Sequence, residues 1–202
     1  MTRTGWLREG VTLSAVTRRL CDGLGVGPTL LPMADAPRAT FVVTDEGRLD
    51  FQTWLVRRRG KPTVRGLHFE GTCIPAPGVV AAIETADLVV IAPSNPYVSV
   101  DPILTLGGVR AAVTAQTVVA VSPIVGGRAV KGPLAEMIPS LAGEPPSAAA
   151  VGRHYASVLD GLVIETGDAA DGPHLATSTV MRNPDDRRRL AEQVLVFGDS
   201  LR

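Results

Sequence analysis

The sequence predicts an α/β protein with a Rossmann-like, mostly parallel sheet, helices on both faces of that sheet, and a smaller lobe. Two apolar runs, 88–92 and 117–121, have the length and composition of buried strands. The segment between them, 102–115, can form a crossover helix, which completes a βαβ unit. Both strands end in loops rich in Ser, Asn, Pro and Gly. These loops fall at the carboxyl edge of the sheet, where open α/β sheets bind ligands.

Strands and helices continue to alternate after this unit, and one helix directly precedes it. Ser147 and Asn183 are good helix N-caps, because their side-chain oxygens can accept hydrogen bonds from the first turn of a helix. The further elements expected are helices at 78–85, 133–142 and 147–159, strands at 161–165 and 174–180, and a last helix at 184–196.

The first 76 residues lack a regular alternation and are expected to form an α+β lobe. Thr12 can cap a helix that ends at Leu24, where three nearby glycines stop it. The other elements expected here are strands at 29–33, 39–44 and 64–70, a turn at 45–48, and a short amphipathic helix at 51–59. The chain is therefore divided into a lobe, 1–76, and a Rossmann-like nucleotide-binding part, 77–202.

The composition excludes several classes of protein. The chain has 202 residues, of which 45% are hydrophobic and 20% charged, as expected of a packed core. Lys+Arg and Asp+Glu both number 20, so no net charge indicates nucleic acid or an anionic membrane as a partner. No apolar run has the length of a membrane span, and the N-terminus lacks the apolar region of a signal peptide, so a cytoplasmic protein is expected. Cys21 and Cys73 form no CxxC, which argues against a disulfide or zinc framework.

The loop SPIVGGRAVKGP, 122–133, is the strongest candidate for a ligand site. It matches neither the Walker motif nor GxGxxG. Backbone N–H groups around Gly126 and Gly127 are expected to face a diphosphate, with Lys131 neutralising its charge and Ser122 and Gly132 completing the loop. The alternative is an ordinary loop with surface charges.

Two further groups of residues are weaker candidates for binding. Ser94, Asn95 and Pro96 follow a buried strand, so Asn95 either bonds a base or ribose or holds a turn. Trp54 and Arg57 on the short helix either clamp a planar ligand or are a packing residue and a solvated charge.

No catalytic residue and no metal ligand can be assigned from the spacing of the residues. Asp35, in a polar loop, is either a carboxylate that binds a metal or a hydroxyl, or a turn former, as a lone Asp usually is. His68, His154 and Tyr155 are single residues without ligand spacing, and His154 is as consistent with a structural role as with a site. The chain contains no nucleophile triad and no paired carboxylates.

Several motifs, in order, resemble a known family. They are GWLREGVTLSAVTRRLCDGLGV, LLPMADAP, FQTWLVRRR, ADLVVIAPSNPYVSVDPIL, VVAVSPIVGGRAVKGP and EPPSAAAVGRHYASVLDGLVIE, which together extend over nearly all of the chain. The sequence resembles the 2-phospho-L-lactate transferase family of coenzyme F-420 biosynthesis, described in actinobacteria as phosphoenolpyruvate transferase.

The resemblance implies a reaction and its partners. A GDP-activated phospholactate or phosphoenolpyruvate is the donor, the ribityl hydroxyl of the deazaflavin Fo is the acceptor, GMP leaves, and Mg²⁺ assists. It places Ser94 and Asn95 at the nucleotide, the 126–132 loop at the diphosphate, and the lobe with Trp54 at the deazaflavin. It also implies a homodimer. The choice between a lactyl and an enolpyruvyl donor stays open.

The front of the chain departs from the family pattern. The family begins with a strand and a GGxGG-type loop, followed by carboxylates that bind the metal and the acceptor, and this sequence has neither. The resemblance therefore implies a truncated chain with little or no transferase activity. Two alternatives remain: a nucleotide-sugar-binding regulatory protein that resembles gluconeogenesis factors, and a remnant that keeps only the sequence signature.

Overall fold

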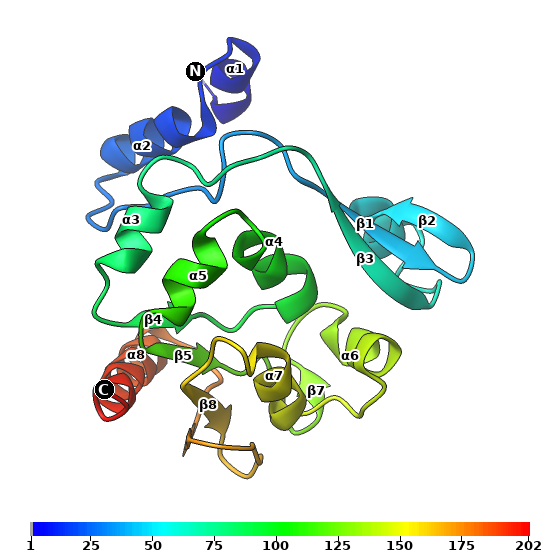
Figure 1. The fold of residues 1–202 in the computed structure, drawn as a ribbon, viewed down its shortest axis with the longest axis vertical. Helices are drawn as coiled ribbons and strands as arrows, with labels where there is room; N and C mark the ends of the chain where they lie inside the picture. The colour runs from blue at the N-terminus through cyan, green and yellow to red at the C-terminus, as the bar shows by residue number, and fades with distance from the viewer. Residues whose placement is uncertain (1) are drawn as a thin grey trace.

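The computed structural model describes residues 2–202 and contains two main sheets (Figure 1). A parallel sheet of four strands has the order β4-β5-β8-β9, and an antiparallel sheet of three strands has the order β2-β1-β3. The strands of the parallel sheet are β4 (Val89–Ile91), β5 (Val118–Val121), β8 (Gly161–Glu165) and β9 (His174–Thr177). The predicted Rossmann-like fold class is confirmed.

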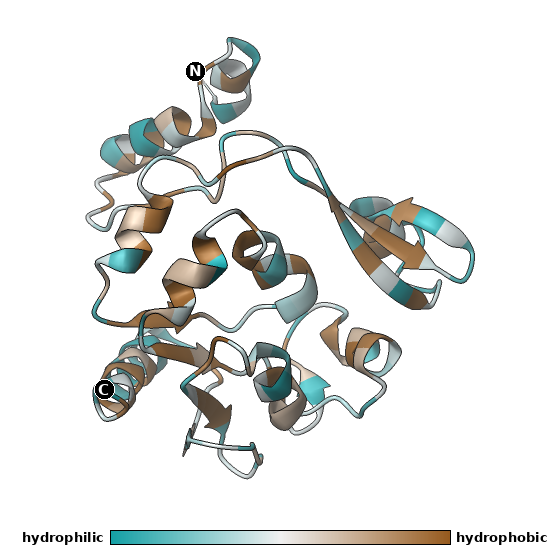
Figure 2. Cartoon of the chain, in the orientation of Figure 1, coloured by the Kyte–Doolittle hydropathy of each residue, from teal (hydrophilic) through white to brown (hydrophobic). Residues whose placement is uncertain are grey.

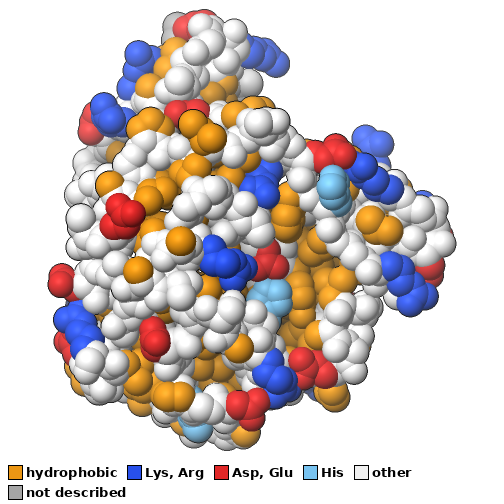
Figure 3. Space-filling view, in the orientation of Figure 1, with side chains coloured by type: hydrophobic (Ala, Val, Ile, Leu, Met, Phe, Trp, Pro, Cys, Tyr) orange, Lys and Arg blue, Asp and Glu red, His pale blue; other side chains and the backbone are white. Residues whose placement is uncertain are grey.

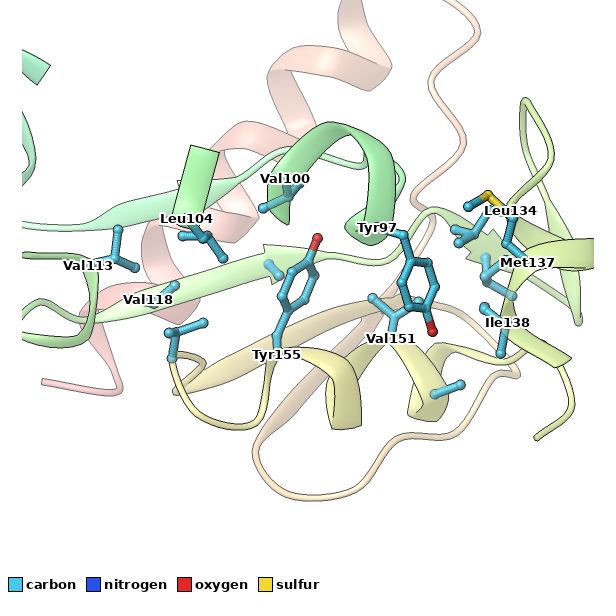
Figure 4. Close-up of a cluster of buried hydrophobic side chains, with 14 of the residues drawn as sticks. Tyr97, Val100, Leu104, Val113, Val118, Leu134, Met137, Ile138, Val151 and Tyr155 are labelled. Carbon is cyan, nitrogen blue, oxygen red and sulfur yellow. The ribbon is translucent and has the colours of Figure 1, made fainter. Parts of the chain in front are cut away.

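Helices cover both faces of the parallel sheet, because its strands are apolar on both sides. Alternate residues of β5 enter different clusters, since successive side chains of a strand point to opposite faces. Val119 and Val121 pack against Leu190 and Val194 of α8 (Pro184–Asp199). Figure 4 shows the other face, where Val118 of β5 belongs to the main buried cluster.

The helices on that main face are short. They are α3 (Val79–Glu84), η2 (Pro96–Val100), α4 (Asp101–Leu104), α5 (Val109–Thr114) and α7 (Ala148–Tyr155). The single crossover helix predicted at 102–115 is wrong. The helix breaks before Gly108, whose left-handed φ of 82° ends one turn and begins α5.

The lobe is built on the antiparallel sheet of β1 (Ala39–Thr44), β2 (Gly47–Asp50) and β3 (Val64–Glu70). The helices α1 (Arg3–Arg8) and α2 (Leu13–Leu24) precede it, and η1 (Thr53–Arg57) connects β2 to β3. The strand predicted at 29–33 is wrong, because that segment is irregular and has no strand partner. Pro28 precedes it and Pro32 lies within it, and both lack the N–H group that a ladder needs.

The two sheets share one hydrophobic core. Val42 and Trp54 of the lobe belong to the same buried cluster as Val118 and Leu162 of the parallel sheet. Helix α6 (Leu134–Ala142) lies against β3 and contributes Met137 to that cluster. Figure 2 shows the hydrophobic colouring concentrated on the strands and on parts of the helices beside them. The predicted division between 76 and 77 stays a prediction.

Three other elements end differently from their predicted bounds. Helix α7 stops at Tyr155 instead of Leu159, strand β9 stops at Thr177 instead of Val180, and α8 continues to Asp199 instead of Val196. Within residues 2–202, no helix combines the length and the apolar character needed to cross a membrane.

Candidate functional site

A cavity of about 250 Å³ lies at the carboxyl edge of the parallel sheet, where the fold class predicts a ligand site. Loops that follow β4, β5 and β9 meet there, together with the segment that leads into α6. The cavity is lined by Pro93, Ser94, Asn95, Ser122, Pro123, Val130, Lys131, Leu134, Thr179, Val180 and Met181.

The structure brings four of the predicted nucleotide-site residues together. Ser94, Asn95, Ser122 and Lys131 line the cavity, although they lie up to 37 positions apart in the sequence. Pro96 and the glycines at 126, 127 and 132 do not line it. Residues 179–181 line the cavity and were missed by sequence reasoning. Their position after β9, at the same edge of the sheet, was the signal that could have found them.

The Asn95 side chain holds the turn that follows β4. Its Oδ1 accepts hydrogen bonds from the N–H groups of Tyr97, at 3.0 Å, and Val98, at 3.4 Å, which caps η2. Its Nδ2 lies 3.4 Å from the Met137 sulfur. The structure therefore gives Asn95 the turn-forming role that the sequence left as an alternative. Pro96 is buried as the first residue of η2.

Ser122 plays a similar part after β5. Its Oγ donates to the Ile124 carbonyl, at 3.0 Å, and accepts from the Ile124 N–H, at 3.1 Å. The residue is 2% exposed. Its hydroxyl is thus occupied in shaping the loop.

The two glycines at 126 and 127 form the tip of a hairpin between β6 (Ile124–Val125) and β7 (Arg128–Ala129). Their φ angles of 54° and 73° fit a type I′ turn, in which both central residues need positive φ. The Gly126 N–H donates to both carboxylate oxygens of Asp168, each at 3.1 Å. A carboxylate of the chain thus binds the amide that the sequence assigned to a diphosphate, and that assignment stays a prediction.

Lys131 supplies the charge of the cavity. It is exposed, and among the lining residues of the described chain it is the one ionisable side chain. The hydroxyl of Ser94 lies on the same cavity. A lysine ammonium beside hydroxyl groups is suited to an anionic ligand such as a phosphate.

Glu165, at the end of β8, holds the segment 179–181, which lines the cavity. Its Oε2 accepts from the Thr179 N–H, at 2.6 Å, and from the Thr179 hydroxyl, at 2.8 Å. Burial alone would raise the pKa of Glu165. Hydrogen bonds from Thr179 and Val180 and the charge of Arg189 outweigh it, so the pKa lies below its ordinary value.

A second polar cluster joins α4 to α7. His154 Nε2 lies 3.0 Å from Asp101 Oδ1, and the His154 ring meets the Tyr97 ring edge-on at 4.5 Å. Burial, and then the charges of Glu144 and Asp101, raise the pKa of Tyr97. Burial also raises the pKa of Tyr155. Asp101 and His154 are 53 positions apart, so no spacing signal linked them.

On the face that Figure 3 shows, hydrophobic side chains gather in a hollow where the antiparallel lobe meets the rest of the chain. The two residues predicted to bind the acceptor, Trp54 and Arg57, differ in their exposure to solvent. Trp54 is only 1% exposed, donates from Nε1 to the Pro62 carbonyl at 2.8 Å and packs near Phe51. The structure therefore gives Trp54 the packing role that the sequence left as an alternative, because its indole is a core group, and a role at the acceptor stays a prediction. Arg57 is exposed to solvent.

A magnesium ion has no protein site that we can name. Among residues 2–202, no three His, Cys, Asp or Glu side chains lie together in a group able to hold a metal ion. The Mg²⁺ that the family resemblance implies stays a prediction, and no step below is derived through it.

Comparison with known proteins places the chain in a family. The family model described as 2-phospho-L-lactate transferase CofD matches residues 1–194. The chain belongs to the CofD family. Among its CofD relatives, the 2-phospho-L-lactate transferase of Methanospirillum hungatei is 37% identical over 196 residues, covering 96% of this chain and 66% of that protein. The phosphoenolpyruvate transferase of Thermobifida fusca is 44% identical over 174 residues, covering 83% of this chain and 54% of that protein.

This CofD chain thus spans about two thirds, or less, of the length of those relatives. Among solved structures, a UPF0052 family protein from Bacillus halodurans superposes with a TM-score of 0.68 at 14% identity, over 96% of this chain and 70% of that one. At this identity the likeness supports the fold alone.

Proposed function

We propose that this chain takes part in transferring a phospholactyl or phosphoenolpyruvyl group from a GDP-activated donor to the deazaflavin Fo, with release of GMP. The observation that carries the proposal is the family membership over residues 1–194, with relatives named for both transfers. The proposal concerns a chain shorter than those relatives, so its activity is to be measured on the chain itself.

The carboxyl-edge cavity supports the donor side of the proposal. A GDP-activated donor carries a diphosphate, and Lys131 offers a cation with no ion pair to another described residue. Val130, Val180 and Met181 give the cavity an apolar wall against which a base or an acyl group can pack. In the proposed reaction the donor diphosphate lies at Lys131.

The chemistry of the transfer is a displacement at phosphorus. The acceptor hydroxyl oxygen forms a new P–O bond to the distal phosphorus, the P–O bond to GMP breaks, and the hydroxyl proton passes to solvent. Such a step depends mainly on positioning and on charge neutralisation. Mg²⁺ is part of the proposal as a group that neutralises charge when bound, and we assign no residue of the chain to it.

The decisive experiment incubates the purified chain with Fo, the GDP-activated donor and Mg²⁺, and measures GMP and the coupled product by mass spectrometry. Lys131→Ala is the test variant and Lys61→Ala, an exposed lysine of the lobe, is the matched control. We expect Lys131→Ala to weaken GDP binding roughly tenfold or more, because a hydrogen bond to a charged group is lost.

Three results would contradict the proposal. Equal affinities for GDP in the wild type and in Lys131→Ala would show that Lys131 does not bind the nucleotide. Binding of a UDP-sugar with no binding of GDP would favour a nucleotide-sugar-binding regulatory protein. Product without GDP-dependent release of GMP would reject the proposed donor.

A further inference from the structure

The cavity wall formed by residues 179–181 is held in place by one carboxylate. Residues 178–182 form neither helix nor strand, so no ladder of backbone bonds fixes them. Glu165 Oε2 instead accepts two hydrogen bonds from Thr179, one from its N–H and one from its hydroxyl. Thr179 is 6% exposed, so this contact is protected from water.

A second contact fixes the same segment from the other side. Arg189 of α8 donates from Nη2 to the Ser178 carbonyl, at 2.8 Å, and from Nη1 to the Gln193 side chain, at 2.8 Å. The segment that leaves β9 is thus held between the end of β8 and the face of α8. Its position decides where Val180 and Met181 stand opposite Ser94.

Glu165 does not itself line the cavity. Any effect it has on a ligand therefore passes through Thr179 and the residues that follow. The carboxylate is charged at neutral pH, since its pKa lies below the ordinary value, and charged acceptors make the stronger hydrogen bonds.

We propose that Glu165 is a positioning residue: through Thr179 it holds residues 179–181 as a wall of the carboxyl-edge cavity and thereby sets the affinity of that cavity for its nucleotide. The part about the nucleotide rests on the proposed function. The part about the wall stands on the contacts alone.

The experiment uses Glu165→Gln, Thr179→Val, the double variant, and Thr179→Ser as the conservative replacement. Thr44→Val is the matched control, because Thr44 is also 6% exposed and its hydroxyl donates to the Gly47 carbonyl at 2.7 Å, in the lobe and away from the cavity. Two readouts are taken on the full chain: amide hydrogen exchange of residues 178–182, and the Kd for GDP by calorimetry.

We expect Glu165→Gln and Thr179→Val each to speed exchange at 178–182 and to raise the Kd for GDP roughly tenfold. The double variant should be no worse than the poorer single one, because both remove the same contact. Thr179→Ser should restore wild-type values, and Thr44→Val should lower thermal stability without changing the Kd.

The outcomes separate this inference from the proposed function. Unchanged exchange at 178–182 in both single variants would overturn the positioning role. Faster exchange with an unchanged Kd would overturn its link to the ligand, and so would an effect of Thr44→Val on the Kd equal to that of Thr179→Val. A wild-type chain that binds no GDP would reject the proposed nucleotide, and the exchange result would then decide on the wall alone.

Discussion

Replacing Trp54 by Phe tests whether this residue belongs to the core or to an acceptor site. The indole is 1% exposed and its Nε1 donates to the Pro62 carbonyl at 2.8 Å. Its ring also lies 3.6 Å from the position a side-chain carbon would take at Gly60, so the turn at 60–62 is built around it. Phe fills most of the same space but cannot donate a hydrogen bond.

The expected loss has two parts. The Pro62 carbonyl becomes a buried acceptor without a partner, which costs about 1–3 kcal/mol. The smaller ring leaves a void beside Gly60, which costs about 1 kcal/mol more, by analogy with other large-to-small core changes. We therefore expect the free energy of unfolding to fall by about 3 kcal/mol. Arg57→Ala, an exposed change three residues away, should alter it by about 0.5 kcal/mol or less.

Urea unfolding followed by far-UV circular dichroism measures this loss. With a slope of about 2 kcal/mol per molar urea, the midpoint of Trp54→Phe should shift down by about 1.5 M. A shift below about 0.5 M, or one equal to that of Arg57→Ala, would refute the assignment of Trp54 to the core. Loss of Fo binding at unchanged stability would instead restore the acceptor role.

Three other changes test separate parts of the structure. Gly198→Ala should lower the thermal midpoint, at a net cost of about 1 kcal/mol, because a Cβ there would lie 2.5 Å from Leu88. Gly23→Ala, where a Cβ would have nothing within 4 Å, should raise the midpoint. Equal shifts in the two variants would contradict the packing at Gly198. Wild type should be more stable in urea than Glu165→Gln above the ordinary glutamate pKa, and this difference should vanish as the pH falls through the lowered pKa of Glu165. A difference that grows in acid would contradict the lowered pKa. Asp168→Asn should speed amide exchange at Gly126 with a stability change of about 1 kcal/mol or less, and unchanged exchange would show that the two contacts do not hold the turn.

Local signals in the sequence predicted much of the fold. The helix caps at Thr12, Ser147 and Asn183 each accept the N–H bond expected of them, and the helices begin where predicted. Strands at 64–70 and 161–165 match the predicted bounds, because apolar pattern and flanking turn residues agree there. Such features depend on neighbours a few positions away.

The errors arise where long-range contacts decide. The segment 29–33 is apolar enough for a strand, yet no partner strand lies beside it, and an apolar pattern alone cannot supply one. Pairs such as Asp101 with His154, or Gly126 with Asp168, join residues 53 and 42 positions apart. The sequence contains both partners of each pair without any spacing that links them.

The arrangement of polar groups narrows which residues are left to bind a ligand. Asn95, Ser122 and Thr179 all line the cavity, but the side chain of each makes a hydrogen bond that shapes its own loop. Among the described residues, the Ser94 hydroxyl and the Lys131 ammonium line the same cavity without such a bond. A preorganised site binds well because its walls are fixed before the ligand arrives. Substitutions at Asn95, Ser122 and Thr179 should therefore act through loop geometry. Substitutions at Ser94 and Lys131 should act through direct contact with the ligand. Raising the ionic strength should therefore weaken ligand binding more in the wild type than in Lys131→Ala, whereas replacing Asn95, Ser122 or Thr179 should lower stability.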